Sequence, residues 1–251
     1  MNKNYEGGFD LHGHTTSMEW WRGFDIVNMS PEQMVTEAKK TGLDGVAITD
    51  HNTIRGLDRA LNAAAKEGII VVPGAEITAH YGINFPHILT LGLDPEIIKN
   101  DPLPHLKDPE TVIKWVHDHG GIAVATHPSE HGGKFRERMP FKDLKRLAPM
   151  FDAIQTHNIQ HGINQGAVEI AEKQNRPKIG GSDFHVMGQV GIVRTKIFNE
   201  AKNWQDVVEA IKQGKTEPFF RQDIPEEMIK NYDRKPILLK TAKEKIKSLL
   251  A

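Results

Sequence analysis

Short apolar strands alternate with amphipathic helices along most of this 251-residue chain, and this alternation most constrains the fold. Strands are predicted over residues 8–12, 46–48, 69–74, 87–92, 122–125, 151–154, 177–180 and 191–195. Helices are predicted over residues 30–42, 53–66, 108–119, 141–147, 162–174 and 204–213. Such alternation favours a parallel α/β sheet, and the first seven of these strands, each of which leads into a functional-looking loop, favour a barrel. An open doubly wound sheet is the alternative, but the chain has neither a G-x-G-x-x-G nor a Walker sequence.

Histidine and carboxylate residues gather where the predicted strands end. In Asp10-Leu11-His12-Gly13-His14 the two histidines would point the same way and converge on one metal ion, with Asp10 on their face. The other candidates at strand ends are His51, Glu76, His127 and Asp183, and His87 begins a strand. In a barrel the carboxyl ends of the strands share one rim, so we expect these side chains to meet in one cleft.

Composition narrows the chemistry. The chain has no cysteine and 13 histidines, so thiolate catalysis, disulfides and cysteine-ligated zinc are excluded, and histidine and carboxylate must bind any metal. The formal net charge is −1, which predicts no general attraction to nucleic acid or anionic membrane. The longest apolar run, 69–72, is too short to cross a bilayer, and no hydrophobic leader opens the sequence, so a soluble cytoplasmic protein is expected.

Two segments are expected. Residues 1–214 would form the barrel domain, and residues 215–251 a charged segment that packs on it. The latter ends in an amphipathic helix over residues 237–250, with a basic face. A solvated basic face is the first interpretation, and a nucleic-acid or oligomer contact is the second.

The motifs at the strand ends resemble, in order, those of the PHP (polymerase and histidinol phosphatase) superfamily. They lie at residues 10–15, 49–51, 73–77, 87–89, 126–128 and 181–185. The resemblance covers residues 9–195 and implies a distorted seven-stranded (β/α)7 barrel. It also implies a rim that binds two or three divalent metal ions, and phosphoester hydrolysis as the usual activity.

Transferred position by position, the resemblance assigns the metal ligands. The first metal would be held by His12, His14, Glu76 and Asp183. Glu76 would bridge to a second metal, held also by His87 and His127. A third would be held by His51 and His185, with Glu19 standing where relatives have a histidine or aspartate. Imidazoles with few carboxylates suit zinc, manganese or iron.

Other roles are assigned more loosely. Lys134, Arg136, Arg138 and Arg194 are candidates for binding substrate phosphate, and a solvated basic loop is the alternative for the first three. The leaving group could be protonated by His161, by His131 or by metal-bound water. Asp10 and Asp50 could orient the ligand imidazoles, and Asn158 could support the rim. The catalytic set is thus His127, Glu76, Asp183, His161 and Arg194.

Together these assignments predict a metal-dependent phosphoesterase. Its substrate would be a small phosphomonoester or a short nucleotide-type phosphodiester, attacked by hydroxide held between two metals. Extended nucleic acid and membrane are not expected partners. Two alternatives remain: an amidohydrolase-type barrel, which would call for a bridging lysine and eight strands, and a metal-binding regulatory barrel without catalysis.

Overall fold

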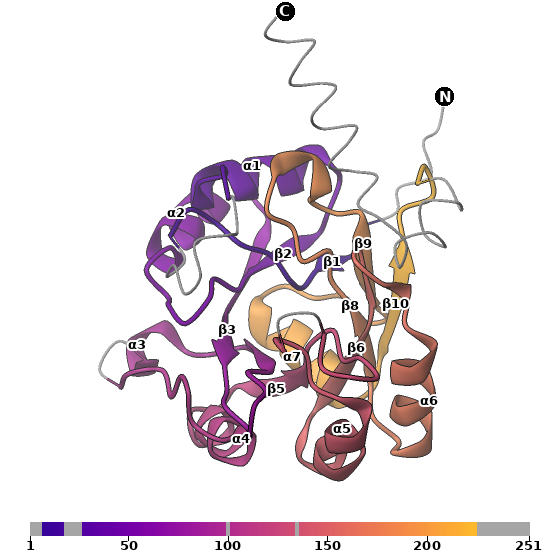
Figure 1. Ribbon diagram of the computed structural model, residues 1–251. Coiled ribbons are helices and arrows are strands. Elements are labelled where there is room, and N and C mark those ends of the chain that lie inside the picture. The colour runs from indigo at the N-terminus through magenta and orange to yellow at the C-terminus, as the bar shows by residue number, and fades with distance from the viewer. Residues whose placement is uncertain (1–6, 18–26, 99–100, 134–135, 225–251) are drawn as a thin grey trace, which may run out of the picture.

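One curled sheet of ten strands organises the part of the chain that the computed structural model describes, residues 7–17, 27–98, 101–133 and 136–224 (Figure 1). The strands are β1 (Phe9–Asp10), β2 (Gly45–Ile48), β3 (Ile70–Thr78), β4 (His87–Leu91), β5 (Ile122–Ala125), β6 (Ala153–Asn158), β7 (Gly162–Ile163), β8 (Lys178–Gly180), β9 (Val193–Ile197) and β10 (Thr216–Phe220). Their order is β10-β9-β1-β2-β3-β4-β5-β6-β7, and β8 pairs with β6.

The sheet mixes parallel and antiparallel pairs. β1, β2 and β3 run parallel, as do β5, β6 and β8, whereas β4 is antiparallel to both β3 and β5. β3 and β4 are adjacent because residues 79–86 leave no room for a crossover helix. Two backbone bonds join the opposite sides of the curl: Asp183 N–H donates to His12 O (2.8 Å) and His14 N–H donates to Phe184 O (2.9 Å).

The α/β class is therefore as expected, but the count of seven strands is not confirmed. The described chain also holds the short β7 and the strand β10, and the strand predicted at residues 191–195 is β9, which runs antiparallel to β1. β10 was not expected at all, since the sequence becomes charged beyond Gly214. Residues 216–220 pair with β9, and the domain boundary at residue 214 stays a prediction.

The helices lie outside and below the sheet. They are α1 (Pro31–Lys40), α2 (Leu57–Glu67), α3 (Pro95–Ile98), α4 (Pro109–Asp118), α5 (Phe141–Leu147), α6 (Gln165–Lys173) and α7 (Trp204–Lys212), with short 3₁₀ turns at Ala148–Met150 and Met187–Gln189. The capping box of Ser30 and Gln33 starts α1 as predicted. α2 begins at Leu57 rather than Thr53, because the Thr53 hydroxyl instead accepts the Arg55 N–H in a local turn (3.2 Å).

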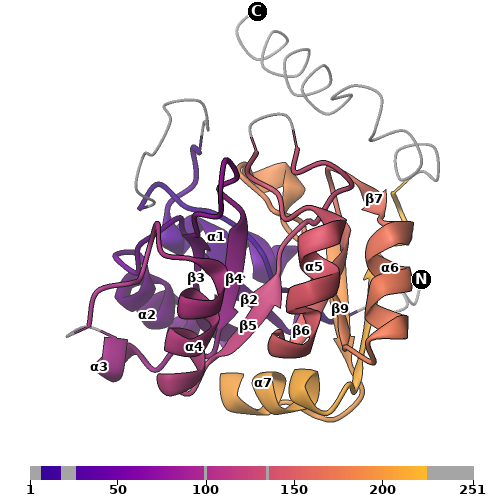
Figure 2. The same cartoon turned by 60° about the horizontal axis from the view of Figure 1, so that its bottom comes forward.

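Side chains on the two faces of the strands pack into two separate hydrophobic cores. On β2, Val46 and Ile48 face the outer core beneath the surrounding helices, while Ala47 faces the inside of the curl. The inner core is closed by α7, whose Val207 and Ile211 pack into it. Figure 2 shows α7 across the lower end of the sheet, so the inside of the curl is filled from that end.

Three sequence predictions fall outside the described residues. They are the ligand Glu19, the phosphate-binding Lys134 and the amphipathic helix over residues 237–250. Within the described residues, no helix is both long enough and apolar enough to cross a membrane.

Candidate metal centre

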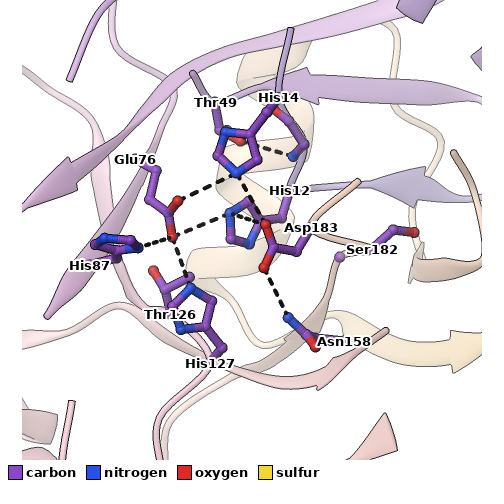
Figure 3. A network of polar contacts seen from close by, with 12 residues as sticks. His12, His14, Thr49, Glu76, His87, Thr126, His127, Asn158, Ser182 and Asp183 are labelled. Carbon is purple, nitrogen blue, oxygen red and sulfur yellow. Dashed lines mark hydrogen bonds and ion pairs between the residues drawn. The ribbon is translucent and has the colours of Figure 1, made fainter. Parts of the chain in front are cut away.

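The carboxylate of Glu76, on β3, lies at the centre of a buried ring of imidazoles (Figure 3). Oε1 faces His127 Nε2 (3.1 Å), His12 Nε2 (3.3 Å) and His87 Nδ1 (3.3 Å), and Oε2 faces His51 Nδ1 (3.2 Å) and His14 Nε2 (3.4 Å). These histidines come from four places along the chain that the curl of the sheet brings together. One carboxylate is thus within contact distance of five imidazoles.

Asp183 closes the other side of the centre. Its Oδ1 lies 3.1 Å from His14 Nε2 and 3.5 Å from His12 Nε2. Both Asp183 and His127 have positive φ, 57° and 28°, which is costly for residues other than glycine. Such strained backbone is typical of functional sites, because it aims a side chain where regular structure would not.

Small residues let the strand ends approach. A Cβ added to Gly181 would lie 2.6 Å from the Cβ of His12, so only glycine fits where the chain before Asp183 crosses the chain before His14. This close approach places Asp183 beside the two histidines.

The ligand atoms form three overlapping groups. In each group one atom per residue lies within 4.8 Å of the others: His12, His14, Glu76 and Asp183; His51, Glu76 and His87; and His14, His51 and His185. The first group is the predicted first ligand set. The second joins Glu76 and His87 as predicted, with His51 in addition, while His127 contacts Glu76 directly.

Charge within the centre is balanced between carboxylates and imidazoles. Burial alone would raise the pKa of Glu76, but the surrounding imidazoles of His87, His12 and His51 hold it well below its usual range. Burial alone would lower the pKa of His12, but the carboxylates of Asp183 and Glu76 raise it to about 9. The buried negative charge thus demands a positive partner, which is a proton on His12 or a cation.

The side chains fit a divalent metal. His12 Nε2, Glu76 Oε2 and His87 Nδ1 are buried in the centre with no hydrogen-bond partner within the described residues. Such atoms cost free energy unless something binds them. Imidazole nitrogens with a few carboxylate oxygens are the donor set that zinc, manganese and iron prefer, whereas calcium requires more oxygen ligands.

Known proteins share this fold and parts of this sequence. The sequence model of the PHP-associated family matches residues 162–216. A two-domain protein from Bacteroides vulgatus that contains a predicted PHP-like metal-dependent phosphoesterase superposes with a TM-score of 0.67. The match has 21% identity and covers 85% of this chain and 64% of that one.

The chain therefore resembles PHP-like proteins in its fold and, over residues 162–216, matches the PHP-associated family model.

Three curated relatives are more similar in sequence over shorter stretches. An uncharacterized protein of Methanocaldococcus jannaschii is 36% identical over 123 residues, 47% of this chain and 66% of its own length. A 5′-3′ exoribonuclease of Haemophilus influenzae is 34% identical over 94 residues, which are 38% of this chain and 30% of the enzyme's length. A 3′,5′-nucleoside bisphosphate phosphatase of Chromobacterium violaceum is 31% identical over 86 residues, which are 34% of this chain and 28% of the enzyme's length. The chain therefore aligns with less than a third of the length of each of these two enzymes.

Two side chains next to the candidate metal centre were missed by sequence reasoning. The buried Gln155 lies on β6 and contacts both His12 and the backbone of His127. Gln160 donates to Asp183 Oδ2 (3.3 Å) and accepts from the Arg138 guanidinium (3.0 Å). Amides carry no sequence signal of metal chemistry, and neither residue belongs to a motif.

The supporting roles of two aspartates stay predictions, and both contact backbone beside ligand candidates. Asp10 accepts N–H bonds from Ser182 and Gly191 (2.8 Å each) and from His12 (3.4 Å), and so ties β1 to the chain around them. Asp50 accepts from the hydroxyl of Thr15 (2.7 Å) and from its N–H. Burial raises the pKa of Asp10 to about 6 and that of Asp50 to about 7.

Asn158 lies where the rim needs support. Its amide contacts Asp183 Oδ2 at 3.5 Å, and its Oδ1 accepts the N–H groups of Gln160 and His161. Burial, together with Arg138 and His127, lowers the pKa of His161 to about 3. His161 is therefore uncharged at pH 7 in this structure, and its role as proton donor stays a prediction. His131 is 88% exposed and pairs with Glu130 (4.0 Å).

The three arginines predicted to bind substrate phosphate differ in burial and in their contacts. Arg194 is 2% exposed and donates to the backbone carbonyls of Gly191, Thr41 and Gly7, so its predicted role in phosphate binding and catalysis is wrong. Arg194 was predicted because it is a basic residue at a strand, and this sequence pattern does not distinguish a structural arginine from one that binds substrate. Arg136 is exposed, while Arg138 is connected through Gln160 to Asp183.

Proposed function

We propose that this protein is a metal-dependent phosphoesterase of the PHP superfamily that hydrolyses a small phosphomonoester or a short nucleotide-type phosphodiester. The observation that carries the proposal is the position of Glu76, a single buried carboxylate facing five imidazoles with Asp183 close by. No structural role requires so many uncompensated ligand atoms in one place.

Eight side chains would hold the metals. His12, His14, Glu76 and Asp183 would hold the first, Glu76, His87 and His127 the second, and His51 and His185 a third, all zinc, manganese or iron. Bound there, divalent cations lower the pKa of water and polarise the phosphoryl oxygens of a substrate. Glu76 would contribute to both of the first two sites, because its Oε1 lies within 3.3 Å of His12 from the first set and of His87 and His127 from the second.

The protein's own contribution would be positioning. Arg138 is linked by Gln160 to Asp183, which holds its guanidinium at the edge of the centre. A guanidinium there would pair with the non-bridging oxygens of a phosphate group. Asn158 would keep Asp183 oriented through their contact.

The substrate class follows from the chemistry of the centre and from the named relatives. A nucleoside bisphosphate phosphatase and a 5′-3′ exoribonuclease both act on phosphates of nucleotides. The formal net charge of −1 favours no general attraction to a long polyanion. A small phosphoester or the end of a short oligonucleotide is therefore the substrate that we propose.

The test is a panel of phosphomonoesters, nucleotides and short oligonucleotides, assayed with added manganese or zinc. We expect His127→Ala to reduce hydrolysis at least 100-fold, because its imidazole lies 3.1 Å from Glu76. His117→Ala is the matched control, since that histidine lies on α4, pairs with Asp152 and should leave the rate unchanged. Equal rates for wild type and His127→Ala, or wild-type rates no higher than the buffer with metal, would contradict the proposal.

The same assay separates the alternatives. An amidohydrolase-type enzyme would cleave amides or carboxylic esters in a parallel panel, but it would call for a bridging lysine, and here Glu76 is the group between the imidazoles. A regulatory barrel would bind metal without turning over any member of either panel.

A further inference from the structure

The side chain of Asn52 ties the chain after β2 to the end of β3. Asn52 directly follows the ligand candidate His51. Its Oδ1 accepts the N–H of Thr78 (2.8 Å), and its Nδ2 donates to the Thr78 hydroxyl (3.1 Å). Thr78 is the last residue of β3 and is 2% exposed. We call these two hydrogen bonds the Asn52–Thr78 clamp.

Both bonds of the clamp require the same orientation of the Asn52 amide. A backbone N–H can only donate, so the amide atom 2.8 Å from the Thr78 nitrogen is the oxygen. The amide nitrogen then faces the hydroxyl, whose lone pairs accept its hydrogen. The clamp is therefore a complete pair of bonds between one side chain and one residue of β3.

The clamp reinforces a short stretch of backbone pairing. The regular pairing of β2 with β3 ends before His51. Beyond it, an isolated bridge joins His51 to Glu76, in which the Asn52 N–H donates to the Glu76 carbonyl (3.0 Å). The clamp lies just past this bridge and holds the same two segments together through a side chain.

Three ligand candidates lie on the segments that meet at the clamp. Glu76 and Thr78 are two residues apart on β3, so their side chains share one face of the strand. Thr78 is also paired with His87, the first residue of β4. His51, Glu76 and His87 form one of the groups whose ligand atoms lie within 4.8 Å of one another. Figure 3 shows His87 facing Glu76 in this group.

The other large group is held by different contacts. His12, His14 and Asp183 are brought together by the backbone bonds from Asp183 N–H to His12 O and from His14 N–H to Phe184 O. Glu76 is the residue that the two groups share. Loss of the clamp should therefore loosen the group of His51, Glu76 and His87 and leave the contacts among His12, His14 and Asp183 in place.

We propose that Asn52 is a positioning residue that holds His51, Glu76 and His87 close enough together to bind a metal ion. This inference rests on the metal centre of the proposed function. It assigns to Asn52 an effect on one part of the centre, whereas a residue that merely stabilised the fold would affect all metal ions alike.

Two substitutions separate the clamp from the backbone conformation. The φ of Asn52 is 53°, in the left-handed region that glycine, asparagine and aspartate adopt more readily than other residues. Asn52→Gly keeps this conformation without strain and removes both bonds of the clamp. Asn52→Asp keeps an oxygen that accepts the Thr78 N–H. Asn175→Gly is the matched control, because Asn175 has a φ of 51° and lies beyond the end of α6.

Zinc binding to the metal-free full chain tests the proposal, measured by competition with a chromophoric chelator. We expect wild type to bind at least two zinc ions. In Asn52→Gly one zinc ion should bind within about threefold of its wild-type affinity, and the next should bind roughly 10- to 100-fold more weakly. Asn52→Asp should bind both at least as tightly as one third of the wild-type affinity, and Asn175→Gly should differ from wild type by less than about twofold.

Anomalous scattering at the zinc edge would locate the loss. In crystals of Asn52→Gly the peak beside His12, His14 and Asp183 should keep its wild-type occupancy, while the peak beside His51 and His87 should weaken. Equal losses at both positions, or an aspartate variant that loses as much as the glycine variant, would overturn the proposal.

Failure of this proposal can be told apart from failure of the proposed function. A wild-type protein that binds neither zinc nor manganese would refute the metal centre, and the phosphoesterase with it. A wild type that binds zinc beside His12, His14 and Asp183 alone would refute the group that Asn52 is proposed to hold. If wild type fills both positions and Asn52→Gly is indistinguishable from it, only the role of Asn52 is refuted.

Discussion

The ring of Phe184 lies so close to Gly13 that a Cβ added to the glycine would come within 2.0 Å of the ring's Cζ atom. The backbones of the two residues pair in a parallel bridge, and His14 N–H donates to Phe184 O (2.9 Å). Gly13 separates His12 from His14, and Phe184 lies between Asp183 and His185. The contact between a glycine and a phenyl ring thus brings four ligand candidates together.

Gly13→Ala should therefore impair the centre more than its size suggests. The added methyl group must push Phe184 away, and overpacking of this kind costs on the order of 1–3 kcal/mol of folding stability. A shift of about 1 Å in the ligand segments should reduce phosphoester hydrolysis roughly 100-fold. Gly188→Ala is the control, because nothing lies within 4 Å of its added Cβ. Equal kinetic and thermal effects of the two changes would show that the close approach is unimportant.

Arg138 and Arg136 should differ in their effect on substrate binding. Arg138 is connected to Asp183 through Gln160, whereas Arg136 is exposed. Removing a charge-assisted contact to phosphate costs about 1.5–3 kcal/mol, so Arg138→Ala should lower kcat/KM roughly 10- to 100-fold. Arg136→Ala should change it less than threefold. Steady-state kinetics on the best substrate of the panel would decide, and the reverse ranking would remove Arg138 from phosphate recognition.

Arg194 should affect stability rather than catalysis. Its guanidinium satisfies three buried or partly buried carbonyls, and Arg194→Met leaves them without their donor. We expect a loss of about 2–5 kcal/mol in the free energy of unfolding, measured by urea denaturation. The folded fraction should keep its kcat and KM, and a variant of normal stability with a raised KM would instead restore the predicted phosphate role.

His157 should make the protein sensitive to mild acid. Burial, and then the charge of Lys178, lower its pKa to about 4 from the usual 6.5, and its Nδ1 lies 2.9 Å from the hydroxyl of Thr156. Between pH 6.5 and 4 the unfolded chain binds this proton and the folded one does not, so stability falls as the pH falls.

The expected loss from this histidine is on the order of 1–3 kcal/mol. This loss of folding stability should be complete near pH 4 and absent above pH 7. Urea melts of wild type and His157→Gln across this range would measure it. If the two stabilities change in parallel with pH, His157 makes no contribution to the acid sensitivity.

The position of the ligand candidates was the part of the site most accessible from sequence. His127 and Asp183 follow apolar strands directly, and the geometry of a curled sheet brings such positions to one edge whatever the exact strand count. The number of strands was harder to predict from the sequence. β10 reads as a charged segment containing Pro218, and only its pairing with β9 identifies it as a strand.

The supporting residues could not be assigned because their roles depend on where a side chain ends. Asp10 and Arg194 both stand beside motif residues, yet the carboxylate bonds two backbone N–H groups and the guanidinium bonds three carbonyls. Gln155 reaches His12 across 143 positions of sequence, and no local pattern records a contact of that kind.

The three groups of ligand candidates contain two carboxylates, Glu76 and Asp183, and otherwise imidazoles, which carry no charge when they bind a metal. Two divalent cations would bring four positive charges to these two negative ones. The loaded centre would therefore lack two counter-charges, the number that a phosphomonoester dianion carries at pH 7. Electroneutrality would then favour the substrate and, equally, the phosphate that it releases, so inorganic phosphate and sulfate should be competitive inhibitors.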